Sequence, residues 1–299
     1  MHELQERQSK IIYHYTDGKG AQGILESQSL WATHYRYLND FSELVIFRKA
    51  LANWRSTFYR EPQHVDRLLK GLLDIFCGDQ GKPSETEAYI VSFCDDKGDR
   101  LSQWRAYGRG DGYALGFDRT ELEELKEEEF KINWLDSIYI DSVCYGDSEE
   151  MPEALIPDLN KFIGLLKDQY KGSATDDNVT DDVLNEMFQL FIKCLSRFKH
   201  KGFSEEEEIR LIVFLPNLTS GRREGDGRLE KVIKFRASQN MLVPYIELFG
   251  GKDTLPIKKI MVGPSPYVEI KKRSIQMLLK RKGINPGIVT ISQIPYRGP

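Results

Sequence analysis

The chain has 299 residues, of which 40% are hydrophobic and 29% are charged, so it can build a substantial core and is too balanced in composition for a disordered chain. Its 42 Lys and Arg residues against 46 Asp and Glu residues give a formal net charge of -4, which argues against a general nucleic-acid coat protein but leaves room for a local basic groove. No apolar run approaches the roughly 20 residues that span a membrane, and the polar N-terminus lacks the apolar stretch of a signal peptide. We therefore expect a cytoplasmic protein with no membrane partner.

Common zinc-binding and P-loop motifs are absent from the sequence. The cysteines are far apart and form no CxxC pair, which predicts reduced thiols and neither disulfides nor a zinc site. No HExxH or Walker A loop occurs, which excludes the common zincin and P-loop classes.

The first half of the chain predicts short strands separated by helices. The β-branched and aromatic run at 11–16 predicts a strand, and a short helix and a second extended piece follow it. Asn39 and Asp40 are suitable N-caps, and apolar residues then recur at helical spacing, which predicts a helical insertion at about 40–77. The next predicted elements are a strand at 88–94, a helix at 101–108 and a strand at 112–118. Gly116, inside the last of these strands, indicates a bulge or a close approach of two backbones.

The second half predicts another helical insertion and several more strands. The acidic run at 121–129 is typical of a solvated helix face, and two amphipathic helices form an insertion at about 153–200. The polar, Gly-rich segment at 217–230 predicts a hairpin or a mobile loop with 231–237 as its return strand. The remaining predicted elements are strands at 137–146, 207–215, 241–249, 257–263 and 287–296, and a helix at 268–282 with Gly283 as its C-cap.

These elements predict an α+β fold with mostly antiparallel sheets and inserted amphipathic helices, because the helices fall between groups of strands. We expect a single domain over 1–299, since no repeat or low-complexity linker interrupts the chain. The apolar stripes of the inserted helices need a partner surface. The side chains expected to be buried there are those of Trp54, Leu69, Phe188 and Phe191.

Three separated segments place polar groups on otherwise apolar strands, and they contain His14, Ser92 and the pair Glu206 and Glu208. Alternation along a strand would align Glu206, Glu208 and Arg210 on one face. Two carboxylates on one face repel, so they need either an ion pair with Arg210 or a substrate that becomes cationic. A charged strand edge and a hydrogen-bonded core histidine are the structural alternatives. We expect His14, Ser92 and Glu208 to meet in one cleft.

A series of short motifs runs along the chain, namely YHYT, GILESQSLWA, LNDFSE, VSFCDD, LSQWRAYG, GYALGFD, KHKGFSEEEEIRL, IKKIMVGP and SQIPYR. In this order and spacing, the chain resembles the bacterial domain-of-unknown-function family 2971. The name of that family states no activity.

The aromatic-His-Tyr-Thr strand at 13–16, followed by a GIL helix, is similar to the opening of ADP-ribosyltransferases, including those that act on DNA. Those enzymes carry NAD-site elements on three strands: a His or Arg, a Ser- or Tyr-containing strand, and a Glu that often belongs to an ExE pair. The resemblance implies an ADP-ribosyltransferase-like fold, a glycosyltransferase activity and NAD as the substrate. Cys94 stands where the second element usually has Ser or Thr.

The resemblance also implies a role for each residue of the site. His14 would hydrogen-bond a ribose hydroxyl of NAD, and Thr16 or the neighbouring backbone would hold the nicotinamide amide. Tyr15 or Tyr107 would stack on nicotinamide. Glu208 would be the catalytic carboxylate that stabilises the ribosyl cation, with Glu206 as its helper. The implied cofactor-binding residues are His14, Tyr15, Thr16, Ser92 and Tyr107.

Two other functions remain open at this point. A metal-dependent nuclease would hold Mg²⁺ or Mn²⁺ with Glu206, Glu208 and His14, although no lysine stands beside the glutamates as in PD-ExK nucleases. A non-catalytic binding module would keep the fold without the chemistry.

The partners follow from the transferase hypothesis, which suggests a toxin or phage-defence effector. The expected acceptor is nucleic acid or protein, and an antitoxin or inhibitor protein is a further expected partner. The basic stretches at 258–259, 271–273 and 280–282 form either a nucleic-acid face or an ordinary solvated helix surface.

Overall fold

The computed structural model describes residues 10–38, 41–58, 87–95, 98–108, 111–169, 181–216, 227–238, 241–250 and 255–295. Within these residues the protein has a mixed α+β fold with one large, mostly antiparallel sheet and several helices, which confirms the predicted fold class. The expected helix that contains Leu69, and the expected N-caps Asn39 and Asp40, lie outside the described residues. None of the described helices is both long and apolar enough to cross a membrane.

The large sheet has the strand order β12-β11-β4-β1-β3-β2-β10-β9, and β8 branches from β3 and carries β5 on its other side. Its pairings are antiparallel, except that β11 and β12 run parallel. A separate parallel pair is formed by β6 and β7. The strands are β1 (Ile11–Thr16), β2 (Leu30–His34), β3 (Glu87–Cys94), β4 (Tyr113–Asp118), β5 (Ser137–Ser142), β6 (Cys144–Gly146), β7 (Phe198–His200), β8 (Glu208–Leu215), β9 (Lys234–Ser238), β10 (Met241–Leu248), β11 (Ile257–Val262) and β12 (Val289–Ile291).

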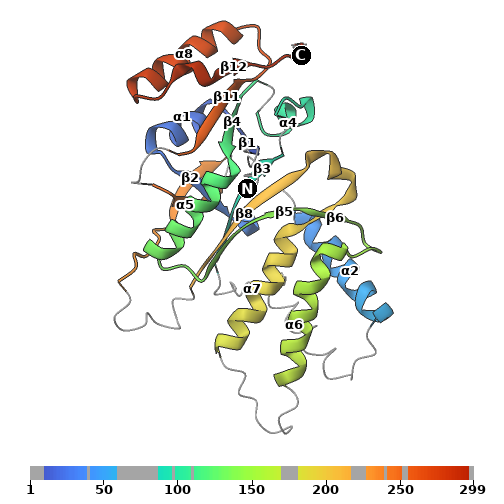
Figure 1. Cartoon of the computed structure of the whole chain (residues 1–299). Coiled ribbons are helices and arrows are strands. Elements are labelled where there is room, and N and C mark those ends of the chain that lie inside the picture. The colour runs from blue at the N-terminus through green and yellow to red at the C-terminus, as the bar shows by residue number, and fades with distance from the viewer. Residues whose placement is uncertain are drawn as a thin grey trace, which may run out of the picture.

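The helices lie at the two ends and on the faces of this sheet. They are α1 (Gly18–Ser27), α2 (Phe41–Phe58), α4 (Leu101–Ala106), α5 (Arg119–Ile132), α6 (Ile156–Gln169), α7 (Asp181–Arg197) and α8 (Val268–Arg281). Short 3-10 helices are η1 (Tyr35–Tyr37), η2 (Glu153–Leu155), η3 (Lys201–Glu206) and η5 (Pro286–Ile288). Figure 1 shows α2, α6 and α7 gathered at one end of the molecule and α8 with β12 at the opposite end. The described part of the first predicted insertion, α2, therefore lies at the same end of the molecule as the helices of the second.

The ends of several elements follow directly from local chemistry. The carboxylate of Asp17 accepts the backbone N–H of Gly20 at the start of α1, and Asp118 caps α5 in the same way. Lys282 is the C-cap of α8, and Gly283 follows it with a φ of 73°, a left-handed conformation that favours glycine, so the helix ends at the predicted glycine, one residue after its cap. Opposite Gly116 the pairing of β4 with β11 shifts register between Ile257 and Lys259, so the bulge lies on the partner strand β11 and not at Gly116 itself.

The branch at β3 is the feature that positions the site. β3 pairs with β8 along its whole length, and this register sets Ser92 opposite Arg210 and Cys94 opposite Glu208. With β1, in contrast, β3 shares the single register pair Tyr13 and Cys94. The sheet therefore opens between β1 and β3, and side chains from β1, β3 and β8 meet at this opening.

The core lies on both sides of the sheet. One cluster fills the space between the sheet, α1, α5 and α8, and a second fills the space between β3, β8 and the helices α2, α6 and α7. Trp54, Phe188 and Phe191 are buried in the second cluster, which confirms their predicted burial. Because these helices contribute long apolar stripes, their association removes a large apolar area from water.

The structure corrects three details of the sequence interpretation. The strand at 231–237 was expected to return beside β8, but β9 pairs with β10, because both sides of β8 are already occupied by β3 and β5. The acidic helix face is not solvated throughout: Glu129 is buried, where it forms an ion pair with Lys231 and accepts the N–H of Phe249. The stretch before Glu208 forms the turn η3, so Glu206 is not on the strand.

We predict that Phe191→Ala lowers the free energy of unfolding by about 3–5 kcal/mol, because it leaves a cavity where α7 packs against Phe47 of α2 and Phe162 of α6. Phe235→Ala makes the same chemical change on β9 at a side chain that is 62% exposed. It should cost less than about 1 kcal/mol. Urea titration of both variants measures the difference, and equal losses would contradict this description of the core.

Candidate active site

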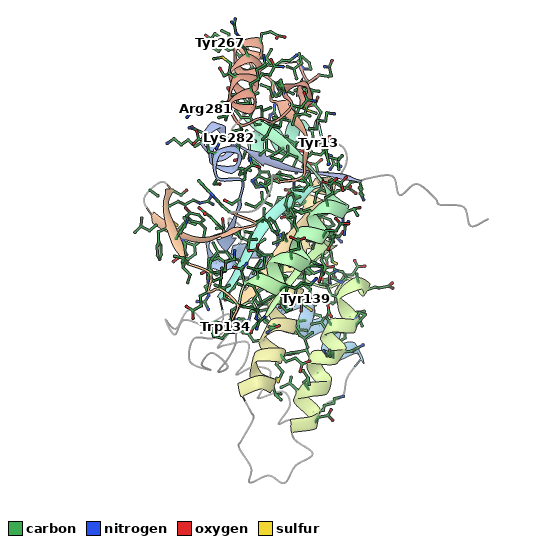
Figure 2. The ribbon with its side chains drawn as sticks, turned by 60° about the vertical axis from the view of Figure 1, so that its left-hand side comes forward. Tyr13, Trp134, Tyr139, Tyr267, Arg281 and Lys282 are labelled. Atoms are coloured by element: carbon green, nitrogen blue, oxygen red, sulfur yellow. The ribbon has the colours of Figure 1, made fainter. Side chains whose placement is uncertain are left out.

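A small pocket with several polar side chains in its wall lies where the sheet opens between β1 and β3. Its volume is about 60 Å³, room for a few water molecules. It is lined by Tyr13, His14, Tyr15, Ser92, Phe93, Cys94, Gln103, Tyr107, Glu206 and Glu208. The expected convergence of His14, Ser92 and Glu208 is therefore observed. Figure 2 places Tyr13 between the α8 end and the α6–α7 end of the molecule.

His14 presents a hydrogen-bond acceptor to this pocket. Its Nδ1 lies 2.8 Å from the carbonyl oxygen of Ser92. Because a carbonyl can only accept, Nδ1 carries the proton, and in the neutral ring Nε2 is then an acceptor. Burial and the charge of Arg236 lower the pKa of His14, although the bond to Ser92 opposes them, so the ring is neutral at pH 7. A neutral imidazole with a fixed tautomer can accept a hydroxyl proton from a ligand.

Glu208 is the centre of a buried ion cluster. Its Oε1 accepts from Nε of Arg210 at 2.7 Å, and its Oε2 accepts from Nη2 of Arg210 at 3.0 Å and from Nζ of Lys199 at 3.1 Å. The Ser92 hydroxyl is a further donor to this carboxylate. Burial by itself would raise the pKa of Glu208, but Arg210, Lys199 and Ser92 together lower it to about 2. Both carboxylate oxygens of Glu208 are thus already engaged within the protein.

Glu206 lies at the end of η3 and joins the same cluster through one oxygen. Its Oε2 accepts from Nζ of Lys199 at 3.0 Å and from the hydroxyl of Tyr107 at 3.2 Å. No described residue donates to Oε1 of Glu206, and the side chain keeps 12% exposure at the pocket. Of the two glutamates, Glu206 therefore has the oxygen that a ligand can reach.

Lys199 is the member of the cluster that the sequence interpretation missed. It lies on β7 with only 1% of its side chain exposed and bridges Glu206 and Glu208. Burial would lower the pKa of Lys199, but Glu208 and Glu206 raise it above its ordinary value, so the ammonium stays charged. The sequence carried no alternation that could have revealed it, because the consecutive residues Phe198 and Lys199 are both buried on this short strand.

A second network holds the turn that carries Glu206. The guanidinium of Arg100 donates to the carbonyl of Glu205 and to the carboxylate of Glu207. The backbone of Glu207 is in the left-handed conformation, with a φ of 44°. The neighbouring Asp99 accepts from Nε1 of Trp104 at 2.8 Å and from the hydroxyl of Ser292 at 2.6 Å. The loop before α4 therefore connects η3 with the C-terminal segment.

Not every predicted ligand-binding residue is free to bind a ligand. The ring of Tyr15 packs edge-on against Trp104, and its hydroxyl donates to the carbonyl of Gly98 at 2.7 Å, so it is a wall of the pocket. Thr16 does not line the pocket, because β1 ends there and its hydroxyl lies against Gly20 at the start of α1. Burial raises the pKa of Cys94 to about 12, so its thiol is protonated and is not a nucleophile at pH 7.

The described residues do not assemble a metal centre at this pocket. No group of three or more His, Cys, Asp and Glu side chains with suitable spacing for a metal ion occurs in the part of the chain that the structure describes. Between Glu206 and Glu208 the positive charge is supplied by Lys199, at the position that a bridging cation would need.

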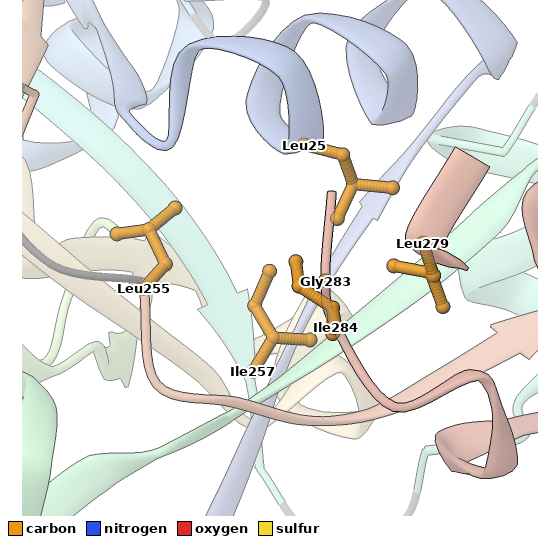
Figure 3. A pocket seen from close by; sticks show the side chains of 6 residues that line it. All are labelled: Leu25, Leu255, Ile257, Leu279, Gly283 and Ile284. Carbon is orange, nitrogen blue, oxygen red and sulfur yellow. The ribbon is translucent and has the colours of Figure 1, made fainter. Parts of the chain in front are cut away.

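A second pocket differs from the first in chemistry. It has a volume of about 150 Å³ and lies between α1, β11 and the end of α8, where its lining side chains face a common space (Figure 3). Its lining residues are Leu25, Leu255, Ile257, Leu279, Gly283 and Ile284. Because these side chains are aliphatic, the pocket offers no acid, base or hydrogen-bond donor for catalysis.

Part of the site lies in a span of the chain that is similar to a known protein family. Residues 103–211 match a protein family of unknown function, DUF2971. The matched span contains Tyr107, Lys199, Glu206, Glu208 and Arg210, whereas His14 and Ser92 precede it. No curated protein and no solved structure matches the chain. These comparisons therefore support the family resemblance over this span and give no support to the resemblance to ADP-ribosyltransferases.

The Glu208 cluster predicts a defined loss of stability in acid. The unfolded chain protonates Glu208 near its ordinary pKa of 4.5, whereas the folded protein resists protonation down to about pH 2. The unfolded state thus binds more protons between these values, and the free energy of unfolding falls by about 3 kcal/mol as the pH drops from 5 to 2. Chemical denaturation across this range should show that loss in the wild type and a smaller one in Glu208→Gln.

At pH 7 we predict that Glu208→Gln destabilises the protein by about 3–5 kcal/mol, because Arg210 and Lys199 would lose their buried counter-charge. Glu207→Gln removes the same charge from the neighbouring residue, which is 43% exposed in its pair with Arg100. That control should cost no more than about 1 kcal/mol. A melting curve of Glu208→Gln that coincides with the control would show that the cluster contributes little to stability.

Proposed function

We propose that the protein is an NAD-dependent ADP-ribosyltransferase whose pocket binds the nicotinamide ribose of NAD. The observation that carries this proposal is the placement of an imidazole acceptor and an accessible carboxylate in one pocket, from His14 on β1 and Glu206 at the end of η3. A sugar hydroxyl donates well to such acceptors. The branched antiparallel sheet around the pocket is consistent with an ADP-ribosyltransferase-like fold.

Each pocket residue has a role in this proposal. Nε2 of His14 accepts a ribose hydroxyl, the half-buried ring of Tyr107 covers the nicotinamide, and Ser92 acts through its bonds to His14 and Glu208. Oε1 of Glu206 faces the ribose carbon that becomes cationic. Glu208 and Lys199 hold Glu206 in place, so the assignment of the two glutamates is the reverse of the one implied by the ExE resemblance.

The transfer is a substitution at the ribose carbon that bears nicotinamide. The bond from this carbon to the ring nitrogen breaks, and its electron pair leaves with neutral nicotinamide. An acceptor nucleophile forms the new bond with its own electron pair and passes its proton to the Glu206 carboxylate. The two carboxylates and two cations of the ion cluster have no net charge. The cationic ribose carbon of the transition state is therefore stabilised by the closeness of Glu206 Oε1 to it.

Release of nicotinamide tests this proposal. We predict that the wild-type chain, incubated with NAD and a cell extract, releases nicotinamide and labels an acceptor with ADP-ribose. Glu206→Gln should lower this rate about 100-fold or more, because it removes a preorganised charge while preserving the shape of the side chain. Its melting temperature should stay close to that of the wild type, since Lys199 retains Glu208.

The matched control is Glu205→Gln, which removes the same charge from an exposed residue of the same turn and should keep the wild-type rate. A wild-type protein that gains thermal stability from NAD but releases no nicotinamide would be a binding module. A protein with neither response to NAD would overturn the proposal.

A further inference from the structure

The outer face of α8 is a strongly basic surface. Val268–Arg281 carries five basic residues against one acidic residue, and Lys282 follows directly, although the whole chain has a net charge of -4. Ile275 and Leu279 are buried against the sheet, so the opposite face of the helix points to solvent. Positive charge is thus concentrated on one helix of an acidic protein.

The exposed cations of α8 have no partners among the described residues. Lys271 donates to Asp111 and Lys282 donates to the carbonyl of Glu26, so these two side chains are used inside the fold. Arg273, Lys280 and Arg281 are exposed, and no carboxylate in the described ranges forms an ion pair with them. Unlike Lys126 on α5 and Lys161 on α6, which pair with nearby glutamates, these side chains are available to an external anion.

The exposed cations form a stripe along the helix axis. One face of α8 carries four positions of this stripe over about two turns, because they are spaced by four, three and one residues: Arg273, Met277, Lys280 and Arg281. Met277 and Ile270 on this face are 64% and 67% exposed, and Tyr267 before the helix is 67% exposed. Figure 2 shows Tyr267 at one end of α8 and Arg281 with Lys282 at the other.

We propose that this face of α8, defined by Tyr267, Ile270, Arg273, Met277, Lys280 and Arg281, binds the phosphate backbone of nucleic acid. A line of unpaired cations complements a chain of phosphates, and an exposed tyrosine beside them gives a base a surface for stacking. An anionic membrane fits the face less well, because the main apolar stripe of α8, with Ile275 and Leu279, is buried in the core and cannot enter a bilayer.

Binding at α8 is independent of any reaction with NAD, so it is measured directly on the full chain. Fluorescence anisotropy with a labelled 20-nucleotide single strand and with its duplex gives the affinity between 50 and 200 mM salt. We expect binding that weakens as salt rises. Arg273→Gln/Arg281→Gln removes two phosphate contacts, so the slope of log affinity against log salt for the single strand should become shallower by about 1.4.

The matched control is Lys49→Gln/Lys131→Gln, which removes the same charge from exposed residues on α2 and α5 and should leave the slope unchanged. Loss of binding in both double variants would show an effect of net charge alone and would overturn the proposal. So would a wild-type protein that binds neither oligonucleotide at 50 mM salt, or one that binds only phosphatidylserine vesicles. Circular dichroism of both variants confirms that they are folded, since all four side chains are on the surface.

Discussion

The fold depends on how the charge of Glu208 is accommodated inside the sheet. A carboxylate, a guanidinium and an ammonium lose their water together when β8, β7 and the end of α7 come together, and only mutual contacts offset that cost. Arg210 donates to Glu208 and to the carbonyl of Ser196, while Lys199 reaches both Glu208 and Glu206. The position of the turn η3 is therefore coupled to the register of β8.

The opening between β1 and β3 creates the pocket beside this ion cluster. Had β1 paired with β3 over its full length, the carbonyl of Ser92 would have been used in the ladder and would not orient His14. The opening instead lets the imidazole and Glu206 face one small space. The aliphatic pocket beside α8, although larger, has no such groups. The larger pocket thus lacks acidic and basic side chains, whereas the smaller pocket has them. The reactive side chains, and not the volume, therefore identify the site.

The pocket and the basic face of α8 occupy different parts of the fold but share a structural connection. Asp99 accepts from Ser292 and from the backbone N–H of Gln293, so the segment that follows β12 is held against the loop that carries Arg100. Arg100 in turn holds η3. A macromolecule bound at α8 would therefore lie at the end of the molecule that contains β12. The loop with Asp99 and Arg100 connects this end to the turn that carries Glu206.

The sequence by itself determined most of the longer strands and helices, and it pointed to His14, Ser92 and Glu208 in the pocket. Apolar runs, helical periodicity and local caps leave their pattern in consecutive residues, as in β8, which is buried at every position, and in the amphipathic α8. The partner of β9 and the burial of Glu129 and Lys199 were decided only by the tertiary structure, since each depends on residues from other elements. The same is true of the two glutamates. They look equivalent in the chain, but in the structure Arg210 donates to both carboxylate oxygens of Glu208. Glu206, in contrast, keeps one oxygen without a donor among the described residues, and its side chain lines the pocket.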